Sequence, residues 1–264
     1  MQAGIVMVLK KQIDYEQIEA LRDYVIENEC KLNIATIKSF EEDFAIRFNH
    51  ESTKLEGNTY TIFEVKTLLT DKISIGGKAL REQYEIINNN KAYEYVLQSV
   101  KNGKDFDEDL IKDIHQIIME NILVGGIYRT ANVKITGASF TPVQWTFVRE
   151  EMKSFIQEAK ELEKELNPIE YASYIHAEFV RIHPFEDGNG RTARMLLNFI
   201  LMKNKYKPVS INTQNKLKYY ESLDLYGRTK TYKEISSIKD FYELILEIER
   251  QNLLEYKNEI DTQI

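Results

Sequence analysis

Apolar and polar residues alternate along most of the chain at the spacing of amphipathic helices. Apolar side chains recur every three or four positions, which places them on one helical face. Only four prolines and eleven glycines interrupt the 264 residues. The pattern predicts a mainly α-helical fold, with helices over residues 14–31, 36–51, 62–71, 78–101, 107–122, 144–165, 168–182, 190–204, 214–226 and 233–257.

Two of these helices have capping residues at their predicted starts. Asn167 can act as an N-cap, followed by Pro168 at the first helical position and by Glu170 at the position of a capping-box glutamate. Thr61 and Glu64 have the same capping-box spacing. We therefore expect helices to begin directly after Asn167 and Thr61.

Residues 125–142 interrupt the helical pattern. β-Branched residues alternate with other residues around Gly137, which predicts a short β-hairpin between two helices. An isolated hairpin in a helical protein has little packing of its own. It is therefore a candidate binding edge, and the alternative is a simple connection.

Composition limits the classes of function. The net charge of -7 argues against nucleic-acid binding, which usually needs a basic face, and no segment has the apolar length of a membrane-spanning helix. The single cysteine, Cys30, allows no disulfide within the chain and is expected to be a buried or half-buried thiol. We expect a cytoplasmic protein that binds neither nucleic acid nor membrane.

One turn between two predicted helices concentrates the chemistry of a phosphate site. Pro184 ends the first helix, and Gly188-Asn189-Gly190 opens the second, so successive backbone N–H groups can converge on one anion at the positive end of a helix. Arg191 and Arg194 are three residues apart and share one helical face.

The same turn holds a carboxylate and an imidazole. Asp187 can hold a divalent cation against the anion, and His183 titrates near neutral pH. These features together predict a phosphate-rich substrate. The alternative is a capped loop whose arginines form surface salt bridges.

The nine residues His183-Pro-Phe-Glu-Asp-Gly-Asn-Gly-Arg191 resemble the motif of the Fic family, His-Pro-Phe-x-(Asp/Glu)-Gly-Asn-(Gly/Lys)-Arg, which a second arginine follows. The resemblance extends over about residues 105 to 240. It implies a Fic helical core that transfers AMP from ATP to a target protein. A Tyr, Thr or Ser hydroxyl of the target would attack the α-phosphorus and expel pyrophosphate.

The resemblance also implies individual roles. His183 is expected to be the general base, and Asp187 to hold Mg²⁺ between the α- and β-phosphates. Arg191 is expected to bind the phosphate chain, and Arg194 the γ-phosphate. The nucleotide site implied by the motif comprises Asp187, Gly188, Asn189, Gly190, Arg191, Thr192, Ala193 and Arg194.

Residues 52–57 resemble the inhibitory motif of the family, (Ser/Thr)-x-x-x-Glu-(Gly/Asn). Ser52 and Glu56 are four residues apart on one helical face, and Gly57 suits a helix end. The resemblance implies that Glu56 pairs with Arg194 and prevents it from holding the γ-phosphate. The chain would then be an autoinhibited enzyme.

Two further segments are assigned by resemblance. The predicted hairpin corresponds to the flap of the family, which covers the nucleotide and aligns the target backbone; its nucleotide contacts would be Ile135, Thr136, Gly137 and Ala138. Tyr219 and Tyr220 resemble the stretch that lines the adenosine pocket. The pattern departs at Gly227, near which several relatives have an asparagine.

We expect three regions along the chain. Residues 1–104 would form an N-terminal helical region with the inhibitory motif, residues 105–245 the Fic core, and residues 246–264 the end of the C-terminal helix. His176 is interpreted as a core or capping histidine, because no metal-ligand spacing includes it, and His115 is expected to pack beside an apolar stripe of isoleucines.

Several alternatives stay open. The same site could remove AMP, with Glu56 positioning a water; it could use another nucleotide donor; or the chain could be a nucleotide-binding regulator without turnover. Self-modification and a homo-oligomeric state are also open.

Overall fold

The computed structural model describes residues 15–229 and 238–263, and its regular structure is helical. The start of the first predicted helix, residue 14, and residues 233–237 of the last lie outside the described residues. The helices are α1 Tyr15–Asn28, α2 Ile34–Leu55, α3 Ile62–Lys66, α4 Leu80–Lys101, α5 Glu108–Ile118, α6 Val148–Leu162, α7 Pro168–Ile182, α8 Asn189–Lys203, α9 Lys216–Thr229 and α10 Lys239–Gln263, with short 3-10 turns at Glu29–Lys31, Trp145–Phe147 and Thr213–Asn215 and a π turn at Thr67–Asp71.

The ten described helices follow the predicted order, and the mainly α-helical fold class is confirmed. Both predicted caps are present. The Asn167 side chain accepts a hydrogen bond from the Glu170 N–H at 2.9 Å, and Thr61 and Glu64 form a reciprocal capping box. The helices accordingly begin at Pro168 and Ile62.

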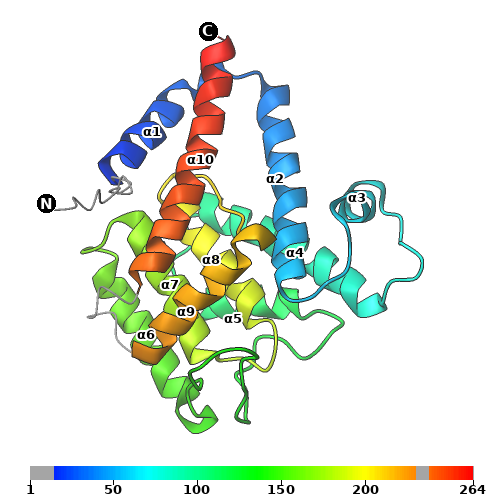
Figure 1. Cartoon of the computed structure of the whole chain (residues 1–264), viewed down its shortest axis with the longest axis vertical. Coiled ribbons are helices and arrows are strands. Elements are labelled where there is room, and N and C mark those ends of the chain that lie inside the picture. The colour runs from blue at the N-terminus through cyan, green and yellow to red at the C-terminus, as the bar shows by residue number, and fades with distance from the viewer. Residues whose placement is uncertain (1–14, 230–237, 264) are drawn as a thin grey trace, which may run out of the picture.

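The helices α7 and α8 form the centre of the fold. They pack against each other along their length, and α4, α5, α6, α9 and α10 surround them (Figure 1). Most side chains of both helices are buried, including Phe179 and Phe199. The turn at residues 183–188 therefore joins two buried helices, which fix the position of its backbone.

The N-terminal helices cover one side of this centre. The helix α2 packs on α4, and its C-terminal end reaches α8 (Figure 1). The buried ring of Phe48 lies 5.7 Å from that of Phe44 and 5.4 Å from that of Tyr93 on α4. These aromatic contacts hold the segment of the inhibitory motif against the core.

The α2 helix ends in a Schellman motif. The N–H of Gly57 donates to the carbonyl of Lys54, and the N–H of Asn58 donates to the carbonyl of Thr53. Gly57 has φ +102°, a conformation that glycine adopts readily. This turn fixes Glu56 at the end of the helix.

The prediction of a β-hairpin is wrong, since residues 125–142 contain no strand in the structure. Residues 135–138 form a turn, in which the Ala138 N–H donates to the Ile135 carbonyl at 3.2 Å. The Arg129 guanidinium donates to the carbonyls of Ala131, His183 and Val143. Hydrogen bonds from one side chain thus satisfy backbone carbonyls around this loop. A lone two-stranded ribbon would be only marginally stable in its place.

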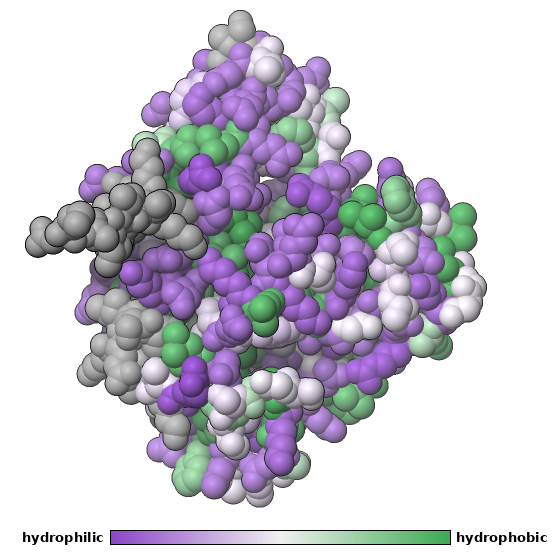
Figure 2. Space-filling model, viewed as in Figure 1, coloured by the Kyte–Doolittle hydropathy of each residue, from purple (hydrophilic) through white to green (hydrophobic). Residues whose placement is uncertain are grey.

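The surface differs from expectation at one residue. Cys30, expected to be buried or half-buried, is exposed. The face in Figure 2 is mostly hydrophilic, and apolar residues gather over α3 and the loop that follows it, where Phe63 and Ile73 are exposed. In the described residues, no helix is long and apolar enough to cross a membrane.

Replacing Phe48 by alanine tests the attachment of α2. The substitution removes a buried ring and leaves a cavity, so we expect a loss of about 3–5 kcal/mol in the free energy of unfolding. Phe63→Ala is the matched control, because Phe63 is 80% exposed whereas Phe48 is 1% exposed, and we expect a change within about 0.5 kcal/mol. Urea denaturation measures both. Equal effects would contradict the proposed packing role.

Candidate active site

His183 ends the α7 helix in the left-handed conformation, with φ 53°, directly before Pro184. Its Nδ1 lies 3.2 Å from the carbonyl oxygen of Val180, so Nδ1 carries the proton and donates it. The lone pair is then on Nε2. Burial, together with the charge of Arg129, lowers the pKa of His183 to about 4. At neutral pH His183 is a neutral imidazole that can accept a proton.

The turn after His183 is closed by its own residues. The Asn189 side chain accepts from the Phe185 N–H and donates to the Phe185 carbonyl, both at 2.9 Å. The Phe185 ring is buried and stacks on His115 at 3.6 Å. A Cβ at Gly188 would lie 2.8 Å from the sulfur of Met119, and the φ of Gly188 is +76°. Glycine is therefore required at that position.

His115, expected from the sequence to pack beside an apolar stripe, supports the loop that carries Asp187. Its Nδ1 accepts a hydrogen bond from the Gly126 N–H at 2.9 Å, so its Nε2 carries the proton and donates to the Asp187 carbonyl oxygen at 2.9 Å. Burial lowers its pKa to about 4, which keeps the ring neutral. Only the tertiary structure places it at the site, 72 residues before Asp187.

Asp187 lies at the mouth of the site. Burial alone raises the pKa of its carboxyl, but the charge of Arg191, the Gly188 N–H and Arg81 outweigh burial and lower it. The Gly188 N–H donates to Oδ1 at 2.6 Å, and Arg81 on α4 donates to Oδ2. Asp187 is therefore an ionised carboxylate, and the Arg81 guanidinium binds its Oδ2.

Arg191 is buried, and some of its N–H donors are not used in hydrogen bonds with the described residues. Its Nε and Nη1 find no hydrogen-bond partner within the described ranges 15–229 and 238–263. Its nearest carboxylate oxygens are Asp187 Oδ1 at 3.5 Å and Glu85 Oε1 at 3.9 Å. The Glu85 oxygen is too far away for a hydrogen bond and interacts with Arg191 only through its charge. A buried guanidinium with free N–H groups is costly unless an anion binds there.

Arg194 is buried, and residues 52–56 supply most of its hydrogen-bond partners. Its Nε donates to Ser52 Oγ at 2.9 Å, and its Nη2 donates to the Ser52 carbonyl at 2.8 Å and to Glu56 Oε1 at 2.7 Å. The structure thus brings Ser52, Glu56 and Arg194 together across 138 or more residues. Gly57 contributes through the helix-ending turn.

Tyr219 and His176 complete the surroundings of Arg194. Arg194 Nη1 donates to the Tyr219 hydroxyl oxygen at 3.3 Å, and the Tyr219 O–H lies 3.1 Å from His176 Nε2. Burial lowers the pKa of His176 far below its usual value, so Nε2 of the neutral ring accepts the hydroxyl proton. Tyr220 donates to the Leu55 carbonyl at 3.0 Å, beside Glu56. Tyr219 thus contacts Arg194, and Tyr220 contacts the segment of residues 52–56 that binds Arg194.

A cavity of about 260 Å³ joins several of these groups. Its walls come from the end of α2, the loop expected as a flap, and the helices α7 to α9: Glu56, Ile135, Thr136, Gly137, Ala138, Phe140, Val180, His183, Gly190, Arg194, Tyr219, Tyr220, Leu223 and Asp224. Thr192 and Ala193 are buried in α8 outside this lining, and the Thr192 hydroxyl donates to the Gly188 carbonyl at 2.9 Å.

The loop over the cavity is fastened to α9. The Ser139 N–H and hydroxyl both donate to the Asp224 carboxylate at 2.6 Å. The Phe140 ring packs directly on Gly227, where a Cβ would lie 2.4 Å from the ring. Gly227, the position that departs from the family pattern, therefore leaves room for Phe140.

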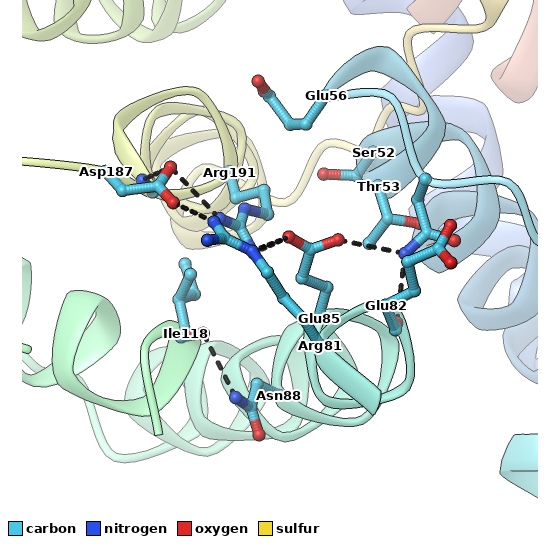
Figure 3. Close-up of polar contacts among 12 residues, drawn as sticks. Ser52, Thr53, Glu56, Arg81, Glu82, Glu85, Asn88, Ile118, Asp187 and Arg191 are labelled. Carbon is cyan, nitrogen blue, oxygen red and sulfur yellow. Dashed lines mark hydrogen bonds and ion pairs between the residues drawn. The ribbon is translucent and has the colours of Figure 1, made fainter. Parts of the chain in front are cut away.

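The α2–α4 region supplies the charges that face the motif. Figure 3 shows Glu85 between Arg191 and the segment that follows Glu56, and Arg81 next to Asp187. Glu85 Oε2 accepts from the Asn58 side chain at 3.0 Å. Sequence reading missed Arg81 and Glu85. The sequence shows that the two residues are four positions apart, but it does not show that they lie near Asp187 and Arg191.

The buried guanidinium of Arg191 in the first turn of α8, near the neutral ring of His183, is suited to binding a phosphate-type anion. Residues 105–201 match the model of the Fic/DOC family. The chain belongs to this family, which confirms the resemblance found in the sequence.

Known relatives agree in fold and sequence. The chain is 28% identical over 239 residues to the protein adenylyltransferase Fic of Aedes aegypti, covering 89% of this chain and 47% of that protein. It is 32% identical over 222 residues to the protein adenylyltransferase fic-1 of Caenorhabditis elegans, covering 81% and 43%. The chain thus spans less than half the length of both relatives.

A solved structure matches almost completely. The crystal structure of a Fic domain containing signaling protein from Bacteroides thetaiotaomicron is 25% identical, with a TM-score of 0.83, and the match covers 94% of this chain and 96% of that one. The likeness therefore includes the N-terminal helices as well as the motif-bearing core.

The state of His183 gives a direct prediction. We expect its imidazole to titrate with a pKa of about 4, because burial disfavours the charged ring. NMR titration of the ring C–H signals measures this, with His183→Asn to assign the resonance. In urea the same ring should titrate near the ordinary value of about 6.5.

The sign of the linked stability follows. Between these two pKa values the unfolded chain binds a proton at His183 that the folded chain does not. The contribution of His183 to stability therefore rises with pH across this window and is lost as pH falls toward 4. A native midpoint near 6.5 would contradict the assigned burial.

Proposed function

We propose that the protein transfers AMP from ATP to a hydroxyl side chain of a target protein, and that Glu56 restrains the reaction. The observation that carries this proposal is the neutral His183 ring on the same cavity as Arg194 and the start of α8. The names of the relatives from Aedes aegypti and Caenorhabditis elegans support the reaction type.

The side chains account for each step of the transfer. His183 Nε2 accepts the proton of the attacking hydroxyl, whose oxygen forms a bond to the α-phosphorus of ATP. The bond from that phosphorus to the pyrophosphate oxygen breaks. The N–H groups at the start of α8, Arg191 and Arg194 then stabilise the negative charge of the leaving group.

The donor set fits a Mg²⁺ ion bound together with the nucleotide. Asp187 is an ionised carboxylate, and Mg²⁺ is commonly held by one or two carboxylates with substrate phosphates. Residues 15–229 and 238–263 contain no cluster of three metal-ligating side chains, so phosphate oxygens and water would supply the other ligands. The ion would neutralise phosphate charge.

The contact between Glu56 and Arg194 supports autoinhibition. Glu56 Oε1 takes an N–H of Arg194 and lies so close to α8 that a Cβ at Gly190 would be 2.3 Å away. A carboxylate therefore stands at the positive end of the helix, where we propose that the γ-phosphate binds. Nucleotide binding in the productive position requires this carboxylate to leave.

The other parts of the proposal rest on general chemistry. We propose that the acceptor is a Tyr, Thr or Ser hydroxyl, of a partner or of the chain itself, and that the lone cysteine fits a reducing compartment such as the cytoplasm. Removal of AMP by the same site remains the second candidate, because Glu56 and His183 line one cavity and could hold a water between them.

Replacing Glu56 by glycine tests the restraint. We expect AMP incorporation from labelled ATP, including self-labelling, to rise at least about tenfold, since a charge-assisted hydrogen bond contributes about 1.5–3 kcal/mol. Glu42→Gln, an exposed change on the same helix, is the control and should leave labelling unchanged. Unchanged labelling by Glu56→Gly would remove the inhibitory role and leave the catalytic one.

Replacing His183 by alanine in the Glu56→Gly background tests the base. We expect the rate to fall by about 10²–10⁴-fold, because general base catalysis contributes about that factor. Retained binding of ATP would show that the loss is chemical. Labelling at full rate would refute the assignment of His183.

The direction of the reaction and the donor need separate assays. Incubation of an AMP-modified target with the wild-type chain and Mg²⁺ measures release of AMP, and labelled CTP, GTP and UTP measure the choice of donor. Release without transfer would favour the second candidate.

A further inference from the structure

An arginine outside the Fic motif contacts the carboxylate of that motif. Arg81 lies in the first turn of α4, and its Nη2 donates to Asp187 Oδ2. Its Nε donates to Glu85 Oε1 at 3.1 Å, one turn later on the same helix. Figure 3 shows the Arg81 side chain extending from α4 to the loop of Asp187.

The two oxygens of Asp187 are not equivalent. Oδ1 is held by the Gly188 N–H at 2.6 Å and lies 3.5 Å from Arg191. Oδ2 is bound by the Arg81 guanidinium. A Mg²⁺ ion binds a carboxylate oxygen at about 2.0–2.1 Å. A guanidinium on the same oxygen would repel the ion.

A second contact, to Glu85, also holds the Arg81 side chain near Asp187. Glu85 holds its Nε, and Glu85 is itself fixed by the Asn58 side chain at 3.0 Å. The side chain of Arg81 is 55% exposed, so its terminal N–H groups can turn without disturbing the core. Arg81 Nε and Arg191 Nη1 lie 3.1 Å and 3.9 Å from the same oxygen, Glu85 Oε1, so the two guanidiniums lie on either side of one carboxylate.

We propose that Arg81 is a phosphate-binding residue that pairs with Asp187 when no nucleotide is bound and moves to the nucleotide phosphates when a divalent metal binds Asp187. This inference rests on the proposed function, because it assumes a nucleotide phosphate chain beside Asp187. It assigns Arg81 two opposing effects: the guanidinium weakens binding of the metal alone and strengthens binding of the metal–nucleotide complex.

The opposing effects make the test specific. In the Glu56→Gly background, Arg81→Gln removes the charge and leaves a shorter, neutral polar side chain. Without nucleotide, we expect Mn²⁺ to bind about twofold to fivefold more tightly, the range for loss of an exposed ion pair. With Mg²⁺ and ATP, we expect ATP to bind at least about threefold more weakly, since a phosphate contact is lost.

Two measurements and two controls complete the experiment. Electron paramagnetic resonance of free Mn²⁺ measures the metal, and calorimetry measures ATP. Arg47→Gln is the matched control, because Arg47 forms an exposed ion pair with Asp43 at 2.6 Å on α2 and should change neither affinity. Asp187→Asn should weaken Mn²⁺ binding and remove the gain from Arg81→Gln.

Each result supports or overturns the proposal. Unchanged Mn²⁺ affinity in Arg81→Gln, or a change of the same sign for Mn²⁺ and for ATP, overturns it. Arg81→Lys keeps the charge and should fall between wild type and Arg81→Gln in both assays. Neither binding assay needs AMP transfer, so a chain that shows the opposing pattern but transfers no AMP would refute the proposed function alone.

Discussion

The burial of two arginines at the start of α8 is the constraint on which the site depends. Arg191 and Arg194 are both almost inaccessible to solvent, and a buried guanidinium must be paired or hydrogen-bonded. Arg194 meets this need through Ser52, Glu56 and Tyr219. Arg191 does not, since two of its nitrogens lack hydrogen-bond partners in the part of the chain described. The fold therefore keeps one arginine occupied and the other ready for an anion.

These partners come from distant segments. The α2 helix supplies Glu56 to Arg194, and α4 supplies Glu85 to Arg191 and Arg81 to Asp187. Arg194, Arg191 and Asp187 of the motif segment are thus each near an opposite charge from the N-terminal helices. If nucleotide binds as we propose, phosphate or metal replaces all three contacts, so the proposal couples nucleotide binding to the placement of α2 and α4.

The histidines show how burial sets chemistry. His115, His176 and His183 are all neutral because desolvation lowers their pKa values. Their hydrogen bonds fix the tautomer of each ring, so His183 alone of the three has Nε2 free of a recorded partner. A single residue type thereby serves as proposed base, as support for the Asp187 loop and as support for Tyr219.

The sequence by itself determined the helical fold, the helix starts at Pro168 and Ile62, and the family, because periodicity, capping and a contiguous nine-residue motif are local signals. It also predicted a β-hairpin that the structure lacks, since local alternation cannot show that Arg129 binds the carbonyls of that loop. Only the tertiary structure decided that Arg81, Glu85, His115 and His176 belong to the site. Their contacts join residues far apart in the chain, and no spacing in the sequence encodes the packing that brings them together.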